Sequence, residues 1–369
     1  MKIAMLVPGG VDRSGEVRVI PAFVALIERL ARDHELHVFA LHQEARPATW
    51  MLRGARVHNA GFEATAWHTL RALLAEHRRG RFDVIQSLFS GKPGALAWAA
   101  AKLLRLPLAV HVTGGELKRF AQYGGSRSWA GRCREAIVLR GAHAVTTPSI
   151  SMISDLKSIG IEASRIPVGV DLTHWQPRLP RRRESSMPAR LIHVGSLNYV
   201  KDQPTLLRAM GLLKSRGRDF RLDIVGDDVL GGAMQRLCAE LGLEGHVYWR
   251  GFLRQTALRE LMLQADLCVM SSMHDAGPVA VLEAATLGIP TVGTSVGHVA
   301  EFAPDAALAT PVGNAVALGA AIDALLDDEE RRCELGRRAM LRAMAEDADH
   351  TAREFHGVYC RLVARHARA

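Results

Sequence analysis

The sequence predicts an α/β protein of two domains, each a largely parallel β-sheet flanked by helices. Its 369 residues exceed the ~100–200 residues of a typical single domain, so two hydrophobic cores are expected. Short apolar runs typical of buried strands alternate with longer amphipathic runs typical of helices. The alternation begins at the N-terminus and begins again near residue 190, after a polar segment rich in Arg and Pro, Arg178–Arg190. We therefore expect one domain over residues 1–178 and a second over residues 179–349.

The first half contains five predicted strands: Lys2–Val7, Glu35–Leu41, Asp83–Leu88, Pro107–Val112 and Ala142–Thr147. Helices are expected at Val17–Ala31, with Pro21 in the first turn or kinking it, and at Ala64–His77 and Gly94–Leu104. The first strand ends in a glycine loop that includes Gly10, and open parallel sheets bind ligands at the carboxyl ends of their strands. The loop lacks the G-x-G-x-x-G spacing, so a dinucleotide site is not indicated.

The second half repeats this pattern. Its predicted strands are Arg190–Val194, Phe220–Val225, His246–Phe252, Leu267–Met270 and Ile289–Val292. Its predicted helices begin near Pro204 and continue with Val279–Thr286, Ala315–Leu326, Glu329–Ala345 and His350–Ala367.

The stretch Ala265–Pro304 carries the most specific pattern in the chain. A buried strand ends in a polar turn, Gly277-Pro278 opens a helix, and acidic residues stand in the turn (Asp275) and in the helix (Glu283). A helix N-terminus presents free N–H groups and the positive end of the helix dipole, which together bind phosphate. The pattern therefore suits a phosphorylated ligand whose hydroxyl groups bond to the two carboxylates. An ordinary α/β crossover with two solvated acids remains the alternative.

A second glycine turn, beginning at Gly195, precedes Lys201. A lysine in this place can neutralise a diphosphate as a point charge. An exposed loop lysine without a ligand is the alternative.

Composition and charge narrow the class of protein. The formal net charge is +9, and residues 1–180 hold 24 Lys and Arg against 14 Asp and Glu. A basic first half favours an anionic partner such as a membrane surface, a lipid phosphate or an acidic glycan, although an Arg-rich composition without a specific partner would look the same. Five scattered cysteines favour a reduced, cytoplasmic protein, and the N-terminus is interpreted as a strand and not as a signal peptide.

Histidines at 34, 37 and 42 have no metal-ligand spacing, and no Asp-x-Asp pair ends a strand, so no metal is expected. The segment Lys118–Arg140 mixes basic and aromatic residues, which suits either a lipid headgroup surface or a solvated loop and helix. No recognised nucleic-acid module accompanies the charge, so nucleic acid is not expected as a partner.

Four motifs resemble glycosyltransferase family 4, a family of retaining nucleotide-sugar enzymes with the GT-B fold. The family pattern S-x-x-E-G-x-P-x-x-x-x-E-A-x-x-x-G-x-P is matched by Ser272, Asp275, Pro278, Glu283, Ala284, Gly288 and Pro290, with Asp275 in place of the first Glu. The glycine of the turn, Gly277, stands one position later than in the pattern and is followed by Pro278. The pattern G-R-L-x-x-x-K-G is matched by Gly195 and Lys201, with Ser196 in place of Arg. The stretch Ile166–Pro177 resembles I-P-N-G-V-D-x-x-x-F-x-P, and Gly297, His298 and Glu301 resemble G-G-x-x-E.

This resemblance implies two Rossmann-like domains that face an interdomain cleft, with the acceptor bound by the first domain and the nucleoside diphosphate sugar donor by the second. It also implies that the helix of about residues 350–369 packs back on the first domain, and that neither a cofactor nor a metal is needed. The donor-binding residues that it implies are Gly10, Gly195, Asn198, Lys201, Ala276, Gly277, Pro278, Val279 and Glu283. Within this set, Glu283 would hold the ribose, residues 276–279 the diphosphate and the sugar, and Lys201 the charge of the leaving group.

Two residues are expected at the reacting centre by the same resemblance. Asp275 would orient the sugar through its 3- and 4-hydroxyls, and His111 would lie near the reacting carbon. A structural histidine is the alternative for His111.

The sequence therefore predicts a retaining glycosyltransferase, a hexosyltransferase that moves a sugar from a nucleoside diphosphate sugar to a glycan, lipid-linked or other cell-envelope acceptor. It would be cytoplasmic, with peripheral contact to the inner face of the membrane as an open alternative. Two other functions remain open: a nucleotide-sugar epimerase of the same fold, and a non-catalytic GT-B binding subunit.

Overall fold

The computed structural model describes residues 1–113, 129–184 and 186–368, and the chain divides into two compact units. Unit 1 comprises Met1–Gly169 and Ala348–Ala369, and unit 2 comprises Val170–Asp347. Each unit is a β-sheet with helices on both faces, so the predicted α/β class with two domains is confirmed.

Unit 1 is built on an eight-stranded sheet in the order β3-β4-β2-β1-β5-β6-β7-β8. The strands are β1 (Lys2–Val7), β2 (Glu35–Ala40), β3 (Ala48–Leu52), β4 (Ala55–Asn59), β5 (Val84–Leu88), β6 (Leu108–His111), β7 (Ala144–Thr147) and β8 (Ser164–Arg165). All neighbours are parallel except β3 and β4, which form an antiparallel hairpin.

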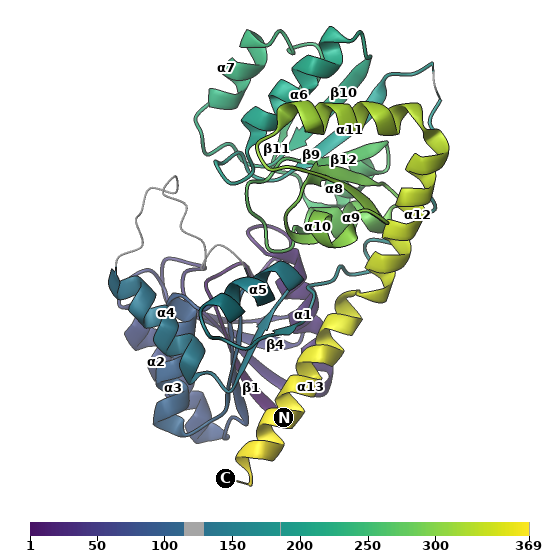
Figure 1. Cartoon of the computed structure of the whole chain (residues 1–369). Coiled ribbons are helices and arrows are strands. Elements are labelled where there is room, and N and C mark those ends of the chain that lie inside the picture. The colour runs from purple at the N-terminus through teal and green to yellow at the C-terminus, as the bar shows by residue number, and fades with distance from the viewer. Residues whose placement is uncertain (114–128, 185, 369) are drawn as a thin grey trace. The chain divides into compact units, whose positions relative to one another are not determined.

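The helices of unit 1 are α1 (Pro21–Asp33), α2 (Thr65–Arg79), α3 (Lys92–Leu104), α4 (Trp129–Gly141), α5 (Ile150–Ser158) and α13 (Ala348–His366). In Figure 1, α2, α3 and α4 lie on one side of the sheet, and α1 and α13 lie on the other. The last helix joins this unit because Phe355, Val358, Tyr359 and Leu362 are buried in one core with strands β1 and β2. Apolar residues at this three- to four-residue spacing form the buried stripe of an amphipathic helix.

Unit 2 is built on a six-stranded sheet, parallel throughout, in the order β11-β10-β9-β12-β13-β14. The strands are β9 (Ala189–Val194), β10 (Phe220–Val225), β11 (Val247–Gly251), β12 (Leu267–Met270), β13 (Thr291–Thr294) and β14 (Ala307–Thr310). Numbered within the unit, this is the order 3-2-1-4-5-6 of a doubly wound nucleotide-binding sheet.

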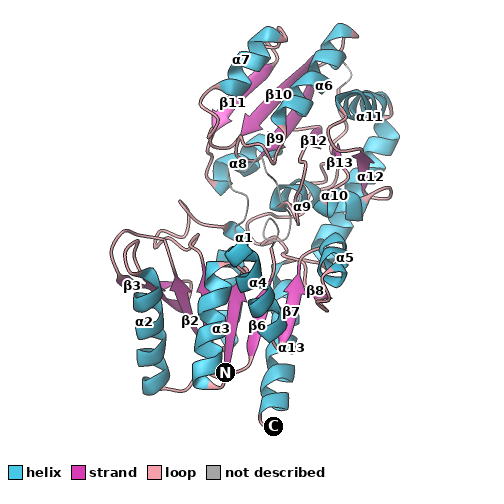
Figure 2. Cartoon of the chain, turned by 60° about the vertical axis from the view of Figure 1, so that its left-hand side comes forward, coloured by secondary structure: helices cyan, strands magenta, loops and turns pink. Residues whose placement is uncertain are grey.

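The helices of unit 2 are α6 (Gln203–Ser215), α7 (Ala233–Glu240), α8 (Gln255–Met262), α9 (Val279–Thr286), α10 (Gly297–Phe302), α11 (Ala315–Asp327) and α12 (Glu329–Ala345). Helices α6, α7 and α11 contribute to the core on one face of the sheet, and α8, α9 and α10 contribute to the core on the other. Figure 2 shows α6 and α7 on the opposite side of β9–β11 from α8.

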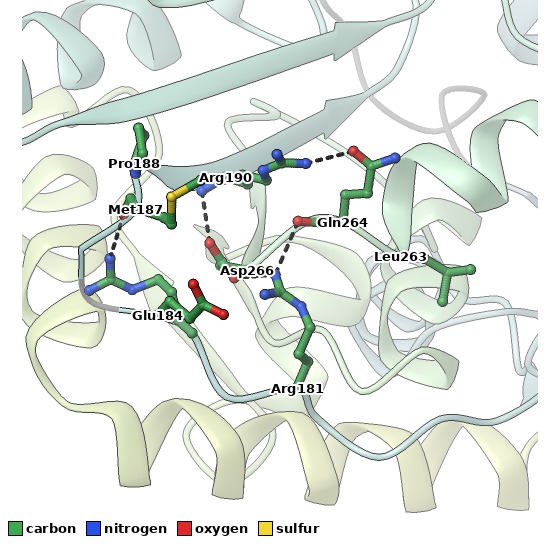
Figure 3. A pocket seen from close by; sticks show the side chains of 9 residues that line it. Arg181, Glu184, Met187, Pro188, Arg190, Leu263, Gln264 and Asp266 are labelled. Carbon is green, nitrogen blue, oxygen red and sulfur yellow. Dashed lines mark hydrogen bonds and ion pairs between the residues drawn. The ribbon is translucent and has the colours of Figure 1, made fainter.

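The polar segment Arg178–Arg190 is anchored to unit 2. Arg181 Nη2 lies 2.6 Å from Asp266 Oδ1, and the backbone N–H of Arg190 donates to the other oxygen of the same carboxylate at 2.9 Å. Figure 3 shows these contacts around a pocket of about 330 Å³. A buried carboxylate of this kind is stabilised by the charged and backbone donors that surround it.

Two local predictions for unit 1 differ from the structure. The first helix begins at Pro21 and not at Val17, because a proline ring has no N–H to donate and is preorganised for the first helical position. The β3–β4 hairpin was not predicted. Its two-residue turn places Arg53 (φ 48°) and Gly54 (φ 86°) in left-handed conformations, and the usual Asn-Gly or Asp-Gly signal of such a turn is absent.

Within the described ranges of the chain, no helix combines the length and the apolar character that crossing a membrane requires. Residues 118–128 of the basic and aromatic segment Lys118–Arg140 lie outside the described residues. The membrane contact that was predicted from this segment therefore stays a prediction.

Candidate functional site

The sheet order of unit 2 creates a ligand crevice between β9 and β12. These two strands are neighbours, and their following loops leave toward opposite faces of the sheet because the order reverses between them. In open parallel sheets, ligands bind outside the carboxyl ends of the strands at such a switch point. The loop after β9 begins at Gly195, and the loop after β12 contains Asp275, so both sequence motifs lie at this point.

The loop after β9 is shaped to present Lys201. The Oδ1 atom of Asn198 accepts hydrogen bonds from the backbone N–H groups of Val200 and Lys201, at 3.0 and 3.1 Å. A Cβ on Gly195 would lie 3.1 Å from the Lys201 side chain, so the absence of a side chain there lets the lysine stem pack against the backbone. Asn198 thus shapes the turn through its carbonyl oxygen.

Lys201 and Asp275 form an ion pair between Nζ and Oδ2. Both side chains remain partly accessible, at 20% and 16%. The two loops are also joined by the backbone, since the N–H of Met273 donates to the carbonyl of Val200 at 2.7 Å. The structure therefore brings together two residues that are 74 positions apart in the sequence, and it leaves both accessible to a ligand.

Helix α9 follows this pair, and its bounds and those of β12 agree with the sequence prediction. Pro278 occupies the N-cap position, and no side chain of the described residues caps the helix there. The first N–H groups of any α-helix have no partner within the helix. Ala276, Gly277 and Val279 have backbone N–H groups in this turn, whereas Pro278 has none, and the helix presents the positive end of its dipole beside the ion pair.

Glu283 lies one helical turn farther along α9 and is 5% exposed. Burial raises the pKa of its carboxyl group to about 8, because the charged form loses its hydration. Asp275 and Glu283 share the turn and helix of one motif, but they differ in environment: the first is ion-paired and the second is enclosed.

His298 is a component of the site to which sequence reasoning assigned no role. It lies in α10 with 0% exposure, and neither ring nitrogen has a hydrogen-bond partner among the described residues. A Cβ on Gly277 would lie 2.9 Å from the Nε2 atom of His298, so the ring packs directly against the turn 276–278. The sequence does contain one indication of it, because His298 occupies the position of the second glycine in the G-G-x-x-E pattern.

Gly10 and His111 belong to unit 1. Gly10 has φ of 78°, and a Cβ there would lie 2.7 Å from Ile20, so the turn after β1 requires glycine. His111 is 1% exposed, its Nδ1 lies 2.9 Å from Thr146 Oγ1, and its ring packs edge-on against Phe355. Burial lowers the pKa of His111 to about 3, so the ring is neutral at pH 7. This enclosure favours the structural alternative for His111.

Comparisons with known proteins agree with this geometry. The family "Glycosyl transferases group 1" matches residues 178–342, and "Glycosyl transferase 4-like domain" matches residues 19–169. The chain is 28% identical to a D-inositol 3-phosphate glycosyltransferase of Pseudarthrobacter chlorophenolicus over 308 residues, which covers 78% of this chain and 72% of that one. Some other curated relatives match over shorter stretches, in one case over 33% of the relative's length.

Two solved structures share the fold over nearly the whole chain. A sucrose-phosphate synthase from Thermosynechococcus elongatus has a TM-score of 0.81 at 20% identity and covers 99% of both chains. Anabaena HepE in complex with UDP-glucose has a TM-score of 0.76 at 17% identity, over 98% of this chain and 100% of that one.

Proposed function

Because the chain is a glycosyltransferase of the GT-B fold with family 4-like domains, we propose that it transfers a sugar from a nucleoside diphosphate sugar with retention at the anomeric carbon. The acceptor that we propose is a glycan, a lipid-linked sugar or another cell-envelope intermediate. A donor of this class is supported by the relatives, because HepE is solved with UDP-glucose and the D-inositol 3-phosphate enzyme is a glycosyltransferase.

The observation that carries this proposal is the Lys201–Asp275 pair at the switch point, beside the uncapped N-terminus of α9. A nucleoside diphosphate sugar offers an anion and several hydroxyl groups at adjacent positions. The anion suits Lys201 and the helix dipole, and the sugar hydroxyls suit the carboxylate of Asp275. One ligand of this kind would therefore satisfy both members of the pair.

In the reaction that we propose, an acceptor hydroxyl oxygen bonds to the anomeric carbon while the bond between that carbon and the β-phosphate oxygen breaks on the same face. The leaving diphosphate gains negative charge and takes up the proton of the hydroxyl. Lys201 and the backbone N–H groups of Ala276, Gly277 and Val279 stabilise this charge as it develops. Glu283 bonds to the ribose hydroxyls, and Gly195 and Asn198 hold the loop that carries Lys201. Gly10 shapes the turn after β1 in unit 1, the unit that we propose binds the acceptor.

The basic charge of the first half supports an anionic acceptor. Residues 1–180 carry ten more Lys and Arg than Asp and Glu, an excess that can attract phosphate or carboxylate groups on a glycan or lipid. Peripheral contact with an anionic membrane from the cytoplasmic side is part of the same proposal, since it would place the enzyme beside a lipid-linked acceptor.

The first experiment is a donor panel in which UDP-sugars and GDP-sugars are incubated with the purified protein and released nucleotide is measured. Lys201→Ala is expected to reduce release by roughly 10²–10³-fold, because a charge that acts on the leaving group is removed. Lys214→Ala is the matched control: it also changes a lysine of unit 2, at the opposite end of α6, and should leave the rate unchanged.

The outcomes separate the three functions. Nucleotide release that depends on an acceptor, with a product of retained anomeric configuration by NMR, supports the transferase. Interconversion of the donor sugar without an acceptor would identify an epimerase. Donor-dependent thermal stabilisation without turnover, under any acceptor tested, would identify a binding subunit.

A further inference from the structure

Unit 1 contains a buried cluster of three metal-ligating side chains that the proposed transfer reaction does not use. His37 comes from β2, His58 from β4 and Glu76 from α2, and their exposed fractions are 3%, 8% and 5%. His37 Nδ1 lies 3.1 Å from His58 Nε2 and 3.9 Å from Glu76 Oε2. One ligand atom from each of the three residues lies within 4.8 Å of the other two.

These separations are close to those around a tetrahedral transition metal. Bonds of about 2.0–2.2 Å from Zn²⁺ to imidazole nitrogen or carboxylate oxygen place neighbouring ligand atoms about 3.3 Å apart. The observed distances of 3.1 and 3.9 Å lie on either side of this value. Small movements of the three side chains, with a reorientation of the two rings, would bring one ligand atom of each residue to an ion.

A second carboxylate orients the first histidine. His37 Nε2 lies 3.0 Å from Glu35 Oε1, so this nitrogen carries the ring proton and donates a hydrogen bond to the carboxylate. The Nδ1 lone pair of His37 is thereby directed toward His58 and Glu76. A carboxylate that accepts from the distal nitrogen of a histidine is the usual outer partner of a metal-ligating histidine.

We propose that His37, His58 and Glu76 form a binding site for a single divalent transition metal of the Zn²⁺ class, with water as the fourth ligand. Two imidazoles and one carboxylate suit such an ion and do not suit Ca²⁺ or Mg²⁺, which prefer oxygen ligands. The site ties strand β4 of the β3–β4 hairpin to strand β2 and to helix α2. Its role is therefore structural and lies in unit 1.

The positions of the protons on the His37 and His58 rings are compatible with metal binding. Without metal, the proton between the two rings belongs to His58 Nε2, because His37 Nδ1 is the acceptor. When an ion binds, His58 takes its other tautomer, with the proton on Nδ1, so no net proton is released from the rings. Metal ligation requires the neutral form of both rings, and the hydrogen bond between them already has one nitrogen as acceptor and the other as donor.

Charged side chains of both signs surround the cluster. Three cations act on the cluster, namely Lys2, Arg56 and Arg79. Lys2 Nζ lies 3.1 Å from Glu35 Oε1, and Arg79 Nη1 lies 2.5 Å from Glu76 Oε1. Two of the three cations are therefore ion-paired, one with the outer carboxylate and one with the carboxylate of the cluster. Glu76 uses its other oxygen, Oε2, toward the histidines, which leaves it available to an ion.

The test is binding of Co²⁺ and Zn²⁺ to the full chain after dialysis against a chelator. We expect one Co²⁺ per chain with the visible absorption of a four-coordinate ion, displacement of that ion by Zn²⁺, and a higher Tm in the presence of Zn²⁺. His58→Gln and Glu76→Gln should abolish the absorption, and Glu35→Gln should weaken binding by about 10–100-fold.

A second histidine pair supplies the matched control. His34 Nε2 lies 3.0 Å from His356 Nδ1, the same kind of contact, and within the described residues that pair belongs to no three-ligand cluster. His34→Gln should leave the absorption and the stoichiometry unchanged. Circular dichroism without metal establishes that each variant is folded. The proposal is overturned if the folded wild-type chain shows no four-coordinate Co²⁺ spectrum, or if His58→Gln binds the ion as the wild type does.

Discussion

At the scale of single residues, the enclosed carboxyl of Glu283 links the site to the stability of the fold. Its pKa is raised from 4.5 to about 8 in the folded chain. Between these two values the folded state keeps a proton that the unfolded state has released. The unfolded state therefore binds fewer protons, and the free energy of unfolding falls as the pH rises through this window.

We expect Glu283→Gln to remove this contribution, because an amide does not ionise. The difference in unfolding free energy between wild type and variant should change by up to ~1.4 kcal/mol per pH unit between about pH 5 and 8, in the direction of a wild type that is less stable at higher pH. Urea unfolding at a series of pH values measures it. Parallel pH profiles for the two proteins would show that the carboxyl is not enclosed as described.

The residues of the site differ in how far the sequence could identify them. Lys201 and Asp275 were assigned from their motifs, and the structure pairs them, but the pairing depends on strand order and not on spacing. His298 was not assigned, because its importance lies in two buried ring nitrogens that make no hydrogen bond among the described residues and in its contact with a glycine 21 positions earlier. His58 and Glu76 were also missed. His58 belongs to a hairpin that the sequence did not predict, and three ligands that come from three separate elements form no recognisable spacing in the sequence.

At the scale of elements, the turn 276–278 packs closely against helix α10 because Gly277 has no side chain. A Cβ at Gly277 would lie 2.9 Å from the His298 ring, closer than ordinary contact. We expect Gly277→Ala to destabilise unit 2 by about 1–3 kcal/mol through overpacking and to weaken donor binding.

The double variant Gly277→Ala/His298→Gly is expected to recover part of this loss, because the colliding ring is gone. The coupling energy from the double-mutant cycle, measured by urea unfolding, should be favourable and at least ~0.5 kcal/mol. Additive effects would mean that the ring moves freely away from the turn.

Predictability also varied between elements. Strand β12 and helix α9 were placed correctly because an apolar run, a Gly-Pro pair and a later glycine mark each boundary. Helix α1 was begun too early because Val17–Ile20 continue its apolar pattern, whereas Pro21 fixes the true start. The hairpin was missed because Arg53 occupies a turn position where glycine, asparagine or aspartate is usual.

At the scale of the molecule, the sequence predicted two α/β domains from the alternation of its patterns, but it could not give the order of the strands. Crossovers place β9 beside β12, and those are distant in the sequence. Nor does composition identify which core receives the last helix. That α13 joins unit 1 follows from the burial of Phe355 and Tyr359 against the strands of that unit.

We expect Phe355→Ala to destabilise unit 1 by about 3–5 kcal/mol, since it removes a buried aromatic ring and leaves a cavity. Hydrogen exchange followed by mass spectrometry should show faster exchange in β1, β5 and β6, with little change in β9, β10 and β12. Protection by a nucleoside diphosphate in unit 2 should persist. A uniform loss of protection in both units would contradict the assignment of this helix to the first core.

The ion pair in the crevice of unit 2 also bears on which anions can compete for it. Because Lys201 is already neutralised by Asp275, a bare anion such as inorganic phosphate must separate the two charges and leaves the carboxylate without compensation. A molecule that carries hydroxyl groups next to its anionic group can bind Lys201 through the anion and Asp275 through the hydroxyls at the same time. The resting site is thereby expected to reject the abundant simple phosphates of a cell while remaining open to a sugar-bearing diphosphate.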